Sequence, residues 1–226
     1  MIYLLLRIIF TPYLRLFHRV EVKGREHIPA TGPAILCANH TSYLDSMLVG
    51  YCTLRPVRFL ITQAFYNHNI MGFFIKGCGA IPVTQRGVDK EAFQMALEAL
   101  RRGELLGIFP EGKLSRTGLP NEGKPGAALL AATTGAMIVP ITISGAFFVF
   151  PKGKLLPRPG RITIKVHPPI NVATEKRGSK QYLREITDKV MARIERTLHP
   201  ALRAHRRRQN IIGRHRPGWG RRHGER

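Results

Sequence analysis

The sequence predicts one α/β domain whose central sheet is largely parallel and covered by helices on both faces. The chain has 226 residues, of which 44% are hydrophobic, and this suits a single domain with a sizeable core. Short apolar segments of strand length alternate with helical segments, and glycine and proline separate them. In such folds functional residues collect at the carboxyl ends of the strands.

The first expected helix covers residues 2–17. Large apolar side chains surround Arg7, Arg15 and His18 there, and the segment is short for a helix that crosses a bilayer. It is either a helix that lies at a membrane surface or a core helix at the edge of the domain, and the basic composition favours the membrane surface. No basic region precedes the apolar residues, so we expect no cleaved signal peptide. Residues 1–18 are therefore predicted to associate with a membrane.

The body of the domain is assigned to residues 19–200. Gly32 and Pro33 lead into its first strand, and Ser42 or Asp45 can cap the helix that follows. Strands are expected at residues 34–38, 57–61, 80–83, 105–109, 137–143 and 161–166. Helices are expected at residues 90–101, 127–134 and 180–198. The helix at 90–101 has the clearest amphipathic pattern.

Residues 129–150 form a run of 22 residues without a charge, which is formally long enough to cross a bilayer. Pro140, two glycines and several hydroxyl side chains divide the run into a helix of small residues and a β-rich segment. We therefore expect a buried helix and strand of the core here.

Lys and Arg total 36 against 14 Asp and Glu, which gives a net charge of +22 with histidine neutral. This excess predicts anionic partners, which include nucleic acid, an anionic membrane or a phosphorylated substrate. Residues 201–226 hold nine Arg, three His and one Glu, and we expect a disordered basic tail there. The three cysteines show no metal-type spacing and no even pairing, which indicates a reducing compartment without a disulfide scaffold.

His40 and Asp45 are the first residues that can carry chemistry, because they lie at the end of a strand and at the start of a helix. A turn between them can bring the carboxylate to one imidazole nitrogen while the other nitrogen takes a proton from a hydroxyl. The alternative is a surface histidine beside a helix cap. The spacing does not place both residues on one helical face, and no further ligand completes a metal site.

The segment 109–116 is the second polar cluster, and it follows another strand. Gly112 lets the backbone approach a ligand, Lys113 and Arg116 supply charge, and Ser115 supplies a hydrogen bond, so the segment can bind a phosphate or a hydroxyl group. The alternative is a solvated turn. Arg86 follows a third strand, and one edge of the sheet can bring all three clusters together.

Four blocks in this order resemble the glycerolipid acyltransferases, most closely the bacterial 1-acyl-glycerol-3-phosphate acyltransferases. The family motifs N-H-x4-D, G-x-I-P-V-x-R, F-P-E-G with a following Ser, and V-P-I are all represented. The matching residues are Asn39, His40 and Asp45; Gly79, Ile81, Pro82, Val83 and Arg86; Phe109, Pro110, Glu111, Gly112 and Ser115; and Val139, Pro140 and Ile141.

The resemblance implies acyl transfer from acyl-coenzyme A or acyl carrier protein to the free hydroxyl of a lysolipid phosphate, giving phosphatidic acid in phospholipid biosynthesis. It implies that His40 is the general base and that Asp45 orients it. It also implies that Arg86, Glu111 and Gly112 bind the glycerol phosphate. No metal or cofactor is expected beyond the thioester co-substrate, and the chain is expected at the cytoplasmic face of the cell membrane as a peripheral or monotopic protein.

One departure from the family concerns the acceptor. Many members have Thr-Arg after Glu-Gly, where this chain has Lys113 and Leu114. Lys113 or Arg116 can replace the missing charge, but neither presents the same fork of donors, so another lysolipid acceptor stays open.

Two hypotheses without catalysis also stay open. A nucleic-acid-binding protein explains the basic tail, but the sequence has no helix-turn-helix, zinc-finger or aromatic ribonucleoprotein signature, and this partner is not expected. An inactive lipid-binding relative is disfavoured by the intact His40 and Asp45.

Overall fold

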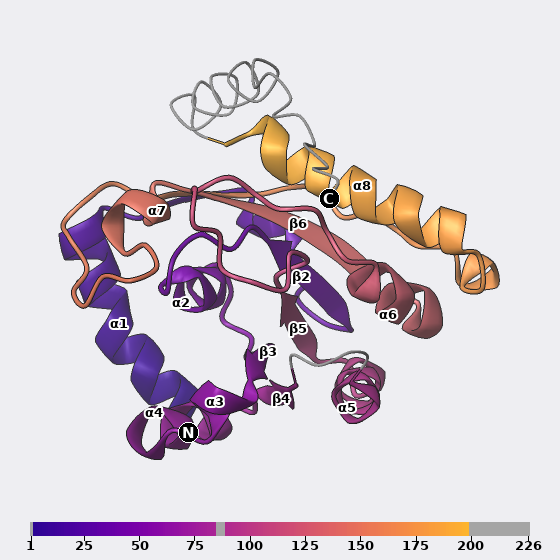
Figure 1. Ribbon diagram of the computed structural model, residues 1–226, viewed down its shortest axis with the longest axis horizontal. Helices are drawn as coiled ribbons and strands as arrows, with labels where there is room; N and C mark the ends of the chain where they lie inside the picture. Colours follow the sequence, from indigo (N-terminus) through magenta and orange to yellow (C-terminus); the bar gives the residue numbers. More distant parts are fainter. Residues whose placement is uncertain (1, 85–88, 199–226) are drawn as a thin grey trace, which may run out of the picture.

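The computed structural model describes residues 2–84 and 89–198 (Figure 1). In this part of the chain a seven-stranded sheet has the order β1-β7-β6-β2-β5-β3-β4. The strands are β1 (Glu21–Lys23), β2 (Ala34–Ala38), β3 (Val57–Thr62), β4 (Ile81–Val83), β5 (Leu105–Ile108), β6 (Met137–Ser144) and β7 (Thr163–Val166). All neighbours are parallel except β6 and β7. The predicted α/β fold with a largely parallel sheet is confirmed.

Helices cover both faces of the sheet. They are α1 (Ile2–His18), α2 (Asp45–Tyr51), α3 (Gln63–Tyr66), α4 (Asn69–Gly77), α5 (Lys90–Arg101), α6 (Gly126–Thr134), α7 (Ala146–Val149) and α8 (Lys180–Arg196), with short 3-10 turns η1 (Arg25–His27) and η2 (Thr174–Lys176). In Figure 1, α5, α6 and α8 lie on one side of the sheet, and α1 and α2 lie on the other.

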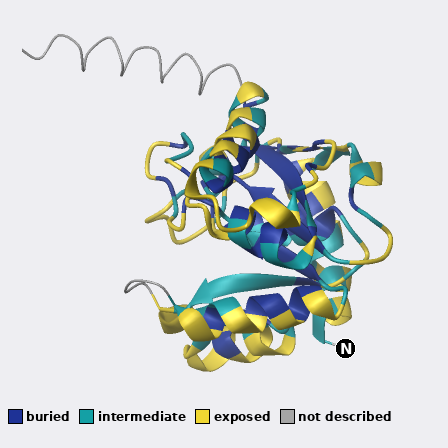
Figure 2. Cartoon of the chain, turned by 90° about the vertical axis from the view of Figure 1, so that its right-hand side faces the viewer, coloured by how far each residue is buried: buried dark blue, intermediate teal, exposed yellow. Residues whose placement is uncertain are grey.

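The central strand β2 divides the core into two apolar clusters. Successive side chains of a strand point to opposite faces, so Ile35 and Cys37 pack with α5, α6 and α8, whereas Leu36 and Ala38 pack with α1, α2 and α7. Every residue of β2 is at most 1% exposed. In Figure 2 the dark blue buried residues lie toward the inside of the molecule, and the outer sides of the helices are exposed.

The charge-free run is part of the core. Its residues form α6 and β6, and the left-handed Gly135 (φ 73°) ends the helix between them. The expected helix and strand are therefore confirmed. Among the described residues, no helix combines the length and the apolar character that a membrane crossing requires.

The sequence analysis did not predict the shortest elements, and it assigned the wrong capping residue to α2. β1, α3 and α7 have three or four residues, too few to show a period, and α4 was also missed. Neither Ser42 nor Asp45 caps α2, because Leu44 occupies the capping position without a side-chain bond. The prediction was wrong because the Asp45 carboxylate turns back to the preceding loop. The predicted tail at 201–226 lies outside the described residues.

Candidate active site

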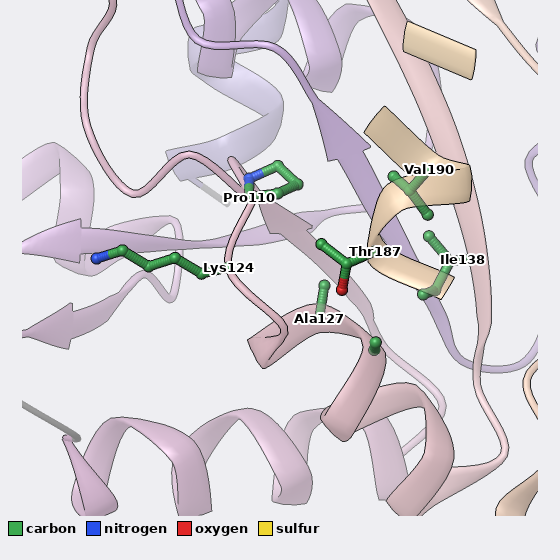
Figure 3. A pocket seen from close by; sticks show the side chains of 7 residues that line it. Pro110, Lys124, Ala127, Ile138, Thr187 and Val190 are labelled. Carbon is green, nitrogen blue, oxygen red and sulfur yellow. The ribbon is translucent and has the colours of Figure 1, made fainter. Parts of the chain in front are cut away.

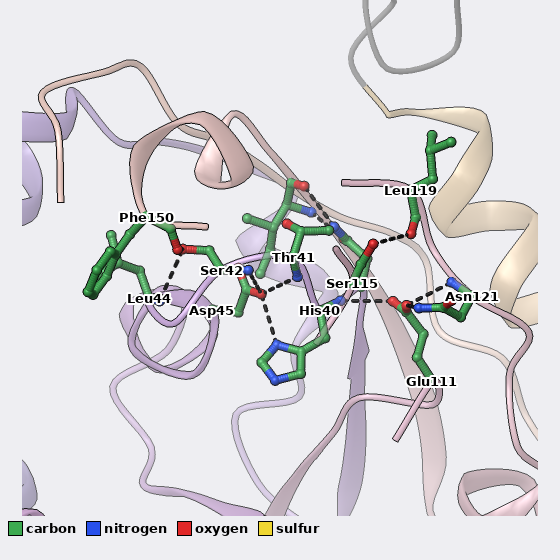
Figure 4. Close-up of polar contacts among 12 residues, drawn as sticks. His40, Thr41, Ser42, Leu44, Asp45, Glu111, Ser115, Leu119, Asn121 and Phe150 are labelled. Carbon is green, nitrogen blue, oxygen red and sulfur yellow. Dashed lines mark hydrogen bonds and ion pairs between the residues drawn. The ribbon is translucent and has the colours of Figure 1, made fainter. Parts of the chain in front are cut away.

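His40 and Asp45 form a hydrogen-bonded pair just beyond the carboxyl end of β2. The distance from His40 Nδ1 to Asp45 Oδ2 is 3.0 Å. The same oxygen accepts the backbone N–H groups of Thr41 at 2.6 Å and Ser42 at 2.8 Å (Figure 4). The turn thus folds around one carboxylate oxygen, and the pair expected from the spacing is formed.

Burial and exposure differ sharply across this pair. The Asp45 side chain is fully buried and that of His40 is 23% exposed. Burial raises the pKa of Asp45, while the hydrogen bonds from His40, Ser42 and Thr41 oppose that shift. With Nδ1 directed at the carboxylate, Nε2 makes no hydrogen bond to any residue that the structure describes, so it is free to accept a proton from a ligand.

Glu111 lies in the loop that follows the neighbouring strand β5, and it binds the backbone of His40. Its Oε1 accepts the backbone N–H of His40 at 2.9 Å, and its Oε2 accepts two N–H donors of Asn121 at 2.7 and 2.8 Å. The backbone N–H of Ser115 donates to the carbonyl of His40 at 2.8 Å. One loop therefore binds both polar groups of the His40 backbone. Burial raises the pKa of Glu111, which is 2% exposed.

Phe109 fixes the face of the imidazole ring. The two rings are stacked with centroids 4.0 Å apart and an angle of 10° between their planes. Phe59 of β3 lies behind Phe109, at 6.0 Å between centroids. The stack leaves the histidine little freedom to rotate away from Asp45.

Positive charge surrounds the turn that follows Glu111. Gly112 has the left-handed φ of 65°, which favours glycine, and a side chain there would contact Lys124. Lys113, Arg116 and Lys124 are exposed, and none of their side chains has a hydrogen-bond or ion-pair partner within residues 2–84 and 89–198. The arrangement can therefore attract an anion beside His40.

The family profile described as Acyltransferase matches residues 19–144, which is more than half of the chain. The chain belongs to this family. That range contains His40, Asp45 and Glu111, and it ends at the last residue of β6.

Named relatives and a solved structure agree with this assignment. The chain is 27% identical to the 1-acyl-sn-glycerol-3-phosphate acyltransferase LPAT1 of Arabidopsis thaliana, over 73% of the chain and 51% of the relative. It is also 27% identical to the 1-acyl-sn-glycerol-3-phosphate acyltransferase of Borreliella burgdorferi, over 78% of the chain and 72% of the relative. The chain thus spans about half the length of the plant protein.

The crystal structure of the 1-acyl-sn-glycerophosphate (LPA) acyltransferase from Thermotoga maritima has a similar fold. It matches with a TM-score of 0.68 and 28% identity, covering 79% of this chain and 71% of that one.

The structure of this family member brings most of the predicted site residues together. His40, Asp45, Glu111 and Ser115 form one connected network, and Gly112, Lys113 and Arg116 lie on the same loop. The hydroxyl of Ser115 is used within the loop, because it donates to the Leu119 carbonyl at 2.7 Å. Arg86 lies outside the described residues, although Thr84 and Asp89 on either side of that segment are hydrogen-bonded.

Sequence reasoning missed Asn121, Lys124 and Phe150. Asn121 binds Glu111 from ten positions along the chain, and the Phe150 carbonyl accepts the Ser42 hydroxyl across 108 positions. The local spacing of residues does not predict such contacts, because they depend on how the loops fold over the edge of the sheet. The only sequence signal for a contact such as that of Asn121 is that residues 109–126 form a compact segment rich in polar residues.

A small cavity lies behind the Pro110 turn, between α6 and α8 (Figure 3). Its volume is about 10 Å³, enough for one water molecule at most. Pro110, Thr187 and Val190 are among its lining residues. It is a packing defect of the core and cannot hold a substrate.

Proposed function

We propose that this chain transfers a fatty acyl group from acyl-coenzyme A or acyl carrier protein to the free hydroxyl of 1-acyl-glycerol-3-phosphate, giving phosphatidic acid. The single observation that carries the proposal is the His40–Asp45 pair, with Nδ1 bound and Nε2 free, in a member of the Acyltransferase family. The acceptor is taken from the relatives, which are 1-acyl-sn-glycerol-3-phosphate acyltransferases by name.

In the proposed reaction His40 Nε2 takes the proton of the acceptor hydroxyl as that oxygen attacks the thioester carbonyl. The new C–O bond forms, the C–S bond breaks, and the imidazolium returns the proton to the leaving thiolate. Buried Asp45 stabilises the imidazolium and holds its tautomer. The acceptor itself is the nucleophile, so no acyl-enzyme is needed, and the thioester is the only co-substrate that the reaction requires.

The proposed phosphate site consists of the cations near the Gly112 turn. Lys113, Arg116 and Lys124 are exposed there, and Arg86 belongs to the segment whose ends are Thr84 and Asp89. The Gly112 backbone can approach the ligand closely. Lys113 and Leu114 stand where many family members have Thr-Arg, so a lysolipid with another head group is the alternative acceptor.

We further propose that the protein docks on the cytoplasmic face of an anionic membrane. Leu14 of α1 is buried in the core, whereas Leu4, Leu5, Ile8 and Ile9 are 53–62% exposed. One side of this helix packs on the domain and the other faces outward, which supports both of the roles that the sequence left open. An apolar helix face together with positive charge is the usual combination for interfacial binding.

The experiment compares purified wild type, His40→Ala and Asp45→Asn with palmitoyl-coenzyme A or palmitoyl-acyl carrier protein and a panel of lysolipids, with products followed by mass spectrometry. We expect phosphatidic acid from the wild type and a kcat lower by about 10²- to 10⁴-fold in both variants. His27→Ala is the matched control, because His27 follows β1 at the opposite edge of the sheet.

Thermal unfolding of each variant shows whether the fold is kept. Turnover retained in His40→Ala would refute the proposed base. Acylation of another lysolipid alone would keep the reaction and replace the acceptor.

A further inference from the structure

The loop at residues 151–160 presents two adjacent leucines to solvent, and we name it the leucine loop. We propose that it is a second membrane-docking element, in which Leu155 and Leu156 enter an anionic leaflet while Lys152, Lys154 and Arg158 bind lipid phosphates. The inference rests on the proposed function only because a lipid acceptor would be found in the membrane that the loop binds.

The exposure of these leucines is extreme. Leu155 is 94% exposed and Leu156 is 78% exposed, although 44 other apolar residues of the described chain are buried. A single exposed leucine is ordinary, but two in succession at the tip of a loop leave a contiguous apolar surface. Insertion into the acyl region removes that surface from water.

Further apolar side chains adjoin the loop. The N–H of Gly160 donates to the carbonyl of Phe17 at 3.4 Å, which ties the loop to the end of α1. Leu16 is 76% exposed and Phe17 is 56% exposed, and Phe148 on α7 is also 56% exposed. Figure 1 shows the loop beside α7 and the end of α1. The apolar surface therefore continues from α1 into the leucine loop.

The charge of the loop selects an anionic occupant. Lys152, Lys154 and Arg158 are exposed, and none has an ion-pair partner in the described ranges 2–84 and 89–198. No acidic residue occurs in the sequence between Glu122 and Glu175. A second copy of this loop would be repelled by the same charges, whereas an anionic leaflet attracts both the cations and the leucines.

The residue that precedes the leucine loop is bonded to the turn between His40 and Asp45. The carbonyl of Phe150, one residue before the loop, accepts the hydroxyl of Ser42 at 2.9 Å and the N–H of Tyr43 at 3.3 Å. The backbone N–H of Ser42 in turn donates to Asp45. Docking of the loop therefore holds the lipid surface close to the His40–Asp45 pair, so that the acceptor can reach Nε2 from the leaflet.

The test measures co-sedimentation of the full chain with vesicles of phosphatidylcholine, alone or mixed with phosphatidylglycerol. Leu155→Ser with Leu156→Ser should lower the partition coefficient by about tenfold or more on both vesicles. Replacing Lys152, Lys154 and Arg158 by Gln should lower it by about fivefold per cation on the anionic vesicles only. Met95→Ser, an exposed apolar position on α5 across the sheet, is the control and should bind as the wild type does.

All positions changed in this test are exposed, so thermal unfolding should not shift. Binding of the leucine variant within twofold of the wild type on both vesicles would overturn the proposal. Turnover is measured separately on vesicle-borne and detergent-dispersed acceptor. A wild type that turns over neither acceptor overturns the proposed function and not the docking, whereas turnover with unaltered vesicle binding of the leucine variant overturns the docking alone.

Discussion

At the scale of single residues, Glu111 connects two sequence blocks that lie far apart in the chain. Its carboxylate accepts one N–H from His40 and two from Asn121, and its side chain is almost fully buried. The resemblance to the family assigns this position to substrate binding, but its oxygens already have donors within the protein. A positioning role for Glu111 and a binding role predict different kinetics.

We expect Glu111→Gln to lower kcat by about 10- to 100-fold with little change in the KM of the acceptor. The amide directs its NH₂ group at one of the three N–H donors and loses a charge-assisted hydrogen bond, which contributes about 1.5–3 kcal/mol. Steady-state kinetics with varied lysolipid measures both parameters. Asn121→Ala, which removes one donor and keeps the carboxylate, should lower kcat less.

A Glu111→Gln variant with an unchanged kcat and a raised acceptor KM would instead show that Glu111 binds substrate. Thermal unfolding before the assay ensures that the comparison uses folded protein.

At the residue scale, the sequence predicted the His40–Asp45 pair but not the other residues that hold His40 in place. His40 and Asp45 are five positions apart, so a turn can bring them into contact, and the resemblance to the family favoured this contact over a surface histidine beside a helix cap. Asn121 binds Glu111, whose carboxylate in turn holds the His40 backbone, and the Phe109 ring stacks on the imidazole. No spacing rule encodes these contacts. The pair could therefore be predicted from the sequence, whereas the contacts that hold it in place are seen only in the structure.

At the scale of elements, the sequence predicted the longer segments better than the shortest ones and better than the direction of one strand. The strand at 34–38 and the helix at 90–101 have the bounds that their apolar patterns predict. β7 is antiparallel to β6, although simple β-α alternation predicts a parallel neighbour, because the chain between them returns through α7 and the leucine loop without a crossover helix. The antiparallel direction of β7 therefore follows from tertiary packing and not from the local sequence pattern.

The docking of α8 depends on a buried histidine. His167 Nε2 lies 2.9 Å from the Thr142 hydroxyl of β6 and 3.2 Å from the Thr197 hydroxyl at the end of α8. His167 is 6% exposed. Burial, followed by the nearby charges of Lys165, Arg193 and His27, lowers the pKa of His167 to about 4.

This shift predicts a loss of stability in mild acid. The unfolded chain binds a proton at His167 near the ordinary pKa of 6.5, while the folded chain stays neutral to about 4, so stability present above pH 6.5 declines as the pH falls toward 4. Between pH 7 and pH 5 the contribution is about 2 kcal/mol. Urea unfolding at both pH values should show the wild type losing that much more stability than His167→Gln.

The comparison between wild type and variant cancels the contributions of Asp45 and Glu111, whose pKa values shift in the other direction. Equal pH dependence in the two proteins would contradict the assignment to His167.

At the scale of the whole molecule, α1 belongs to both the core and the outer surface. Leu14 and His18 are each 1% exposed, and the carbonyls of Phe17 and His18 accept N–H groups from the segment that leads to β7. The Tyr3 hydroxyl donates to the Arg55 carbonyl at 3.1 Å. The helix therefore cannot be treated as an appended anchor, because the domain is built against its inner face.

We therefore expect deletion of residues 1–18 to destabilise the domain as well as to weaken membrane binding. Loss of the buried Leu14 side chain alone costs about 2–5 kcal/mol, and the N–H groups of Gly160 and Ile162 lose their acceptors. Ile8→Ser with Ile9→Ser changes only the outer face, so it should lower the vesicle partition coefficient by about tenfold and leave the melting temperature unchanged. Circular dichroism melts and vesicle co-sedimentation separate the two effects, and a truncated chain that melts with the full-length protein would show that α1 is an anchor and nothing more.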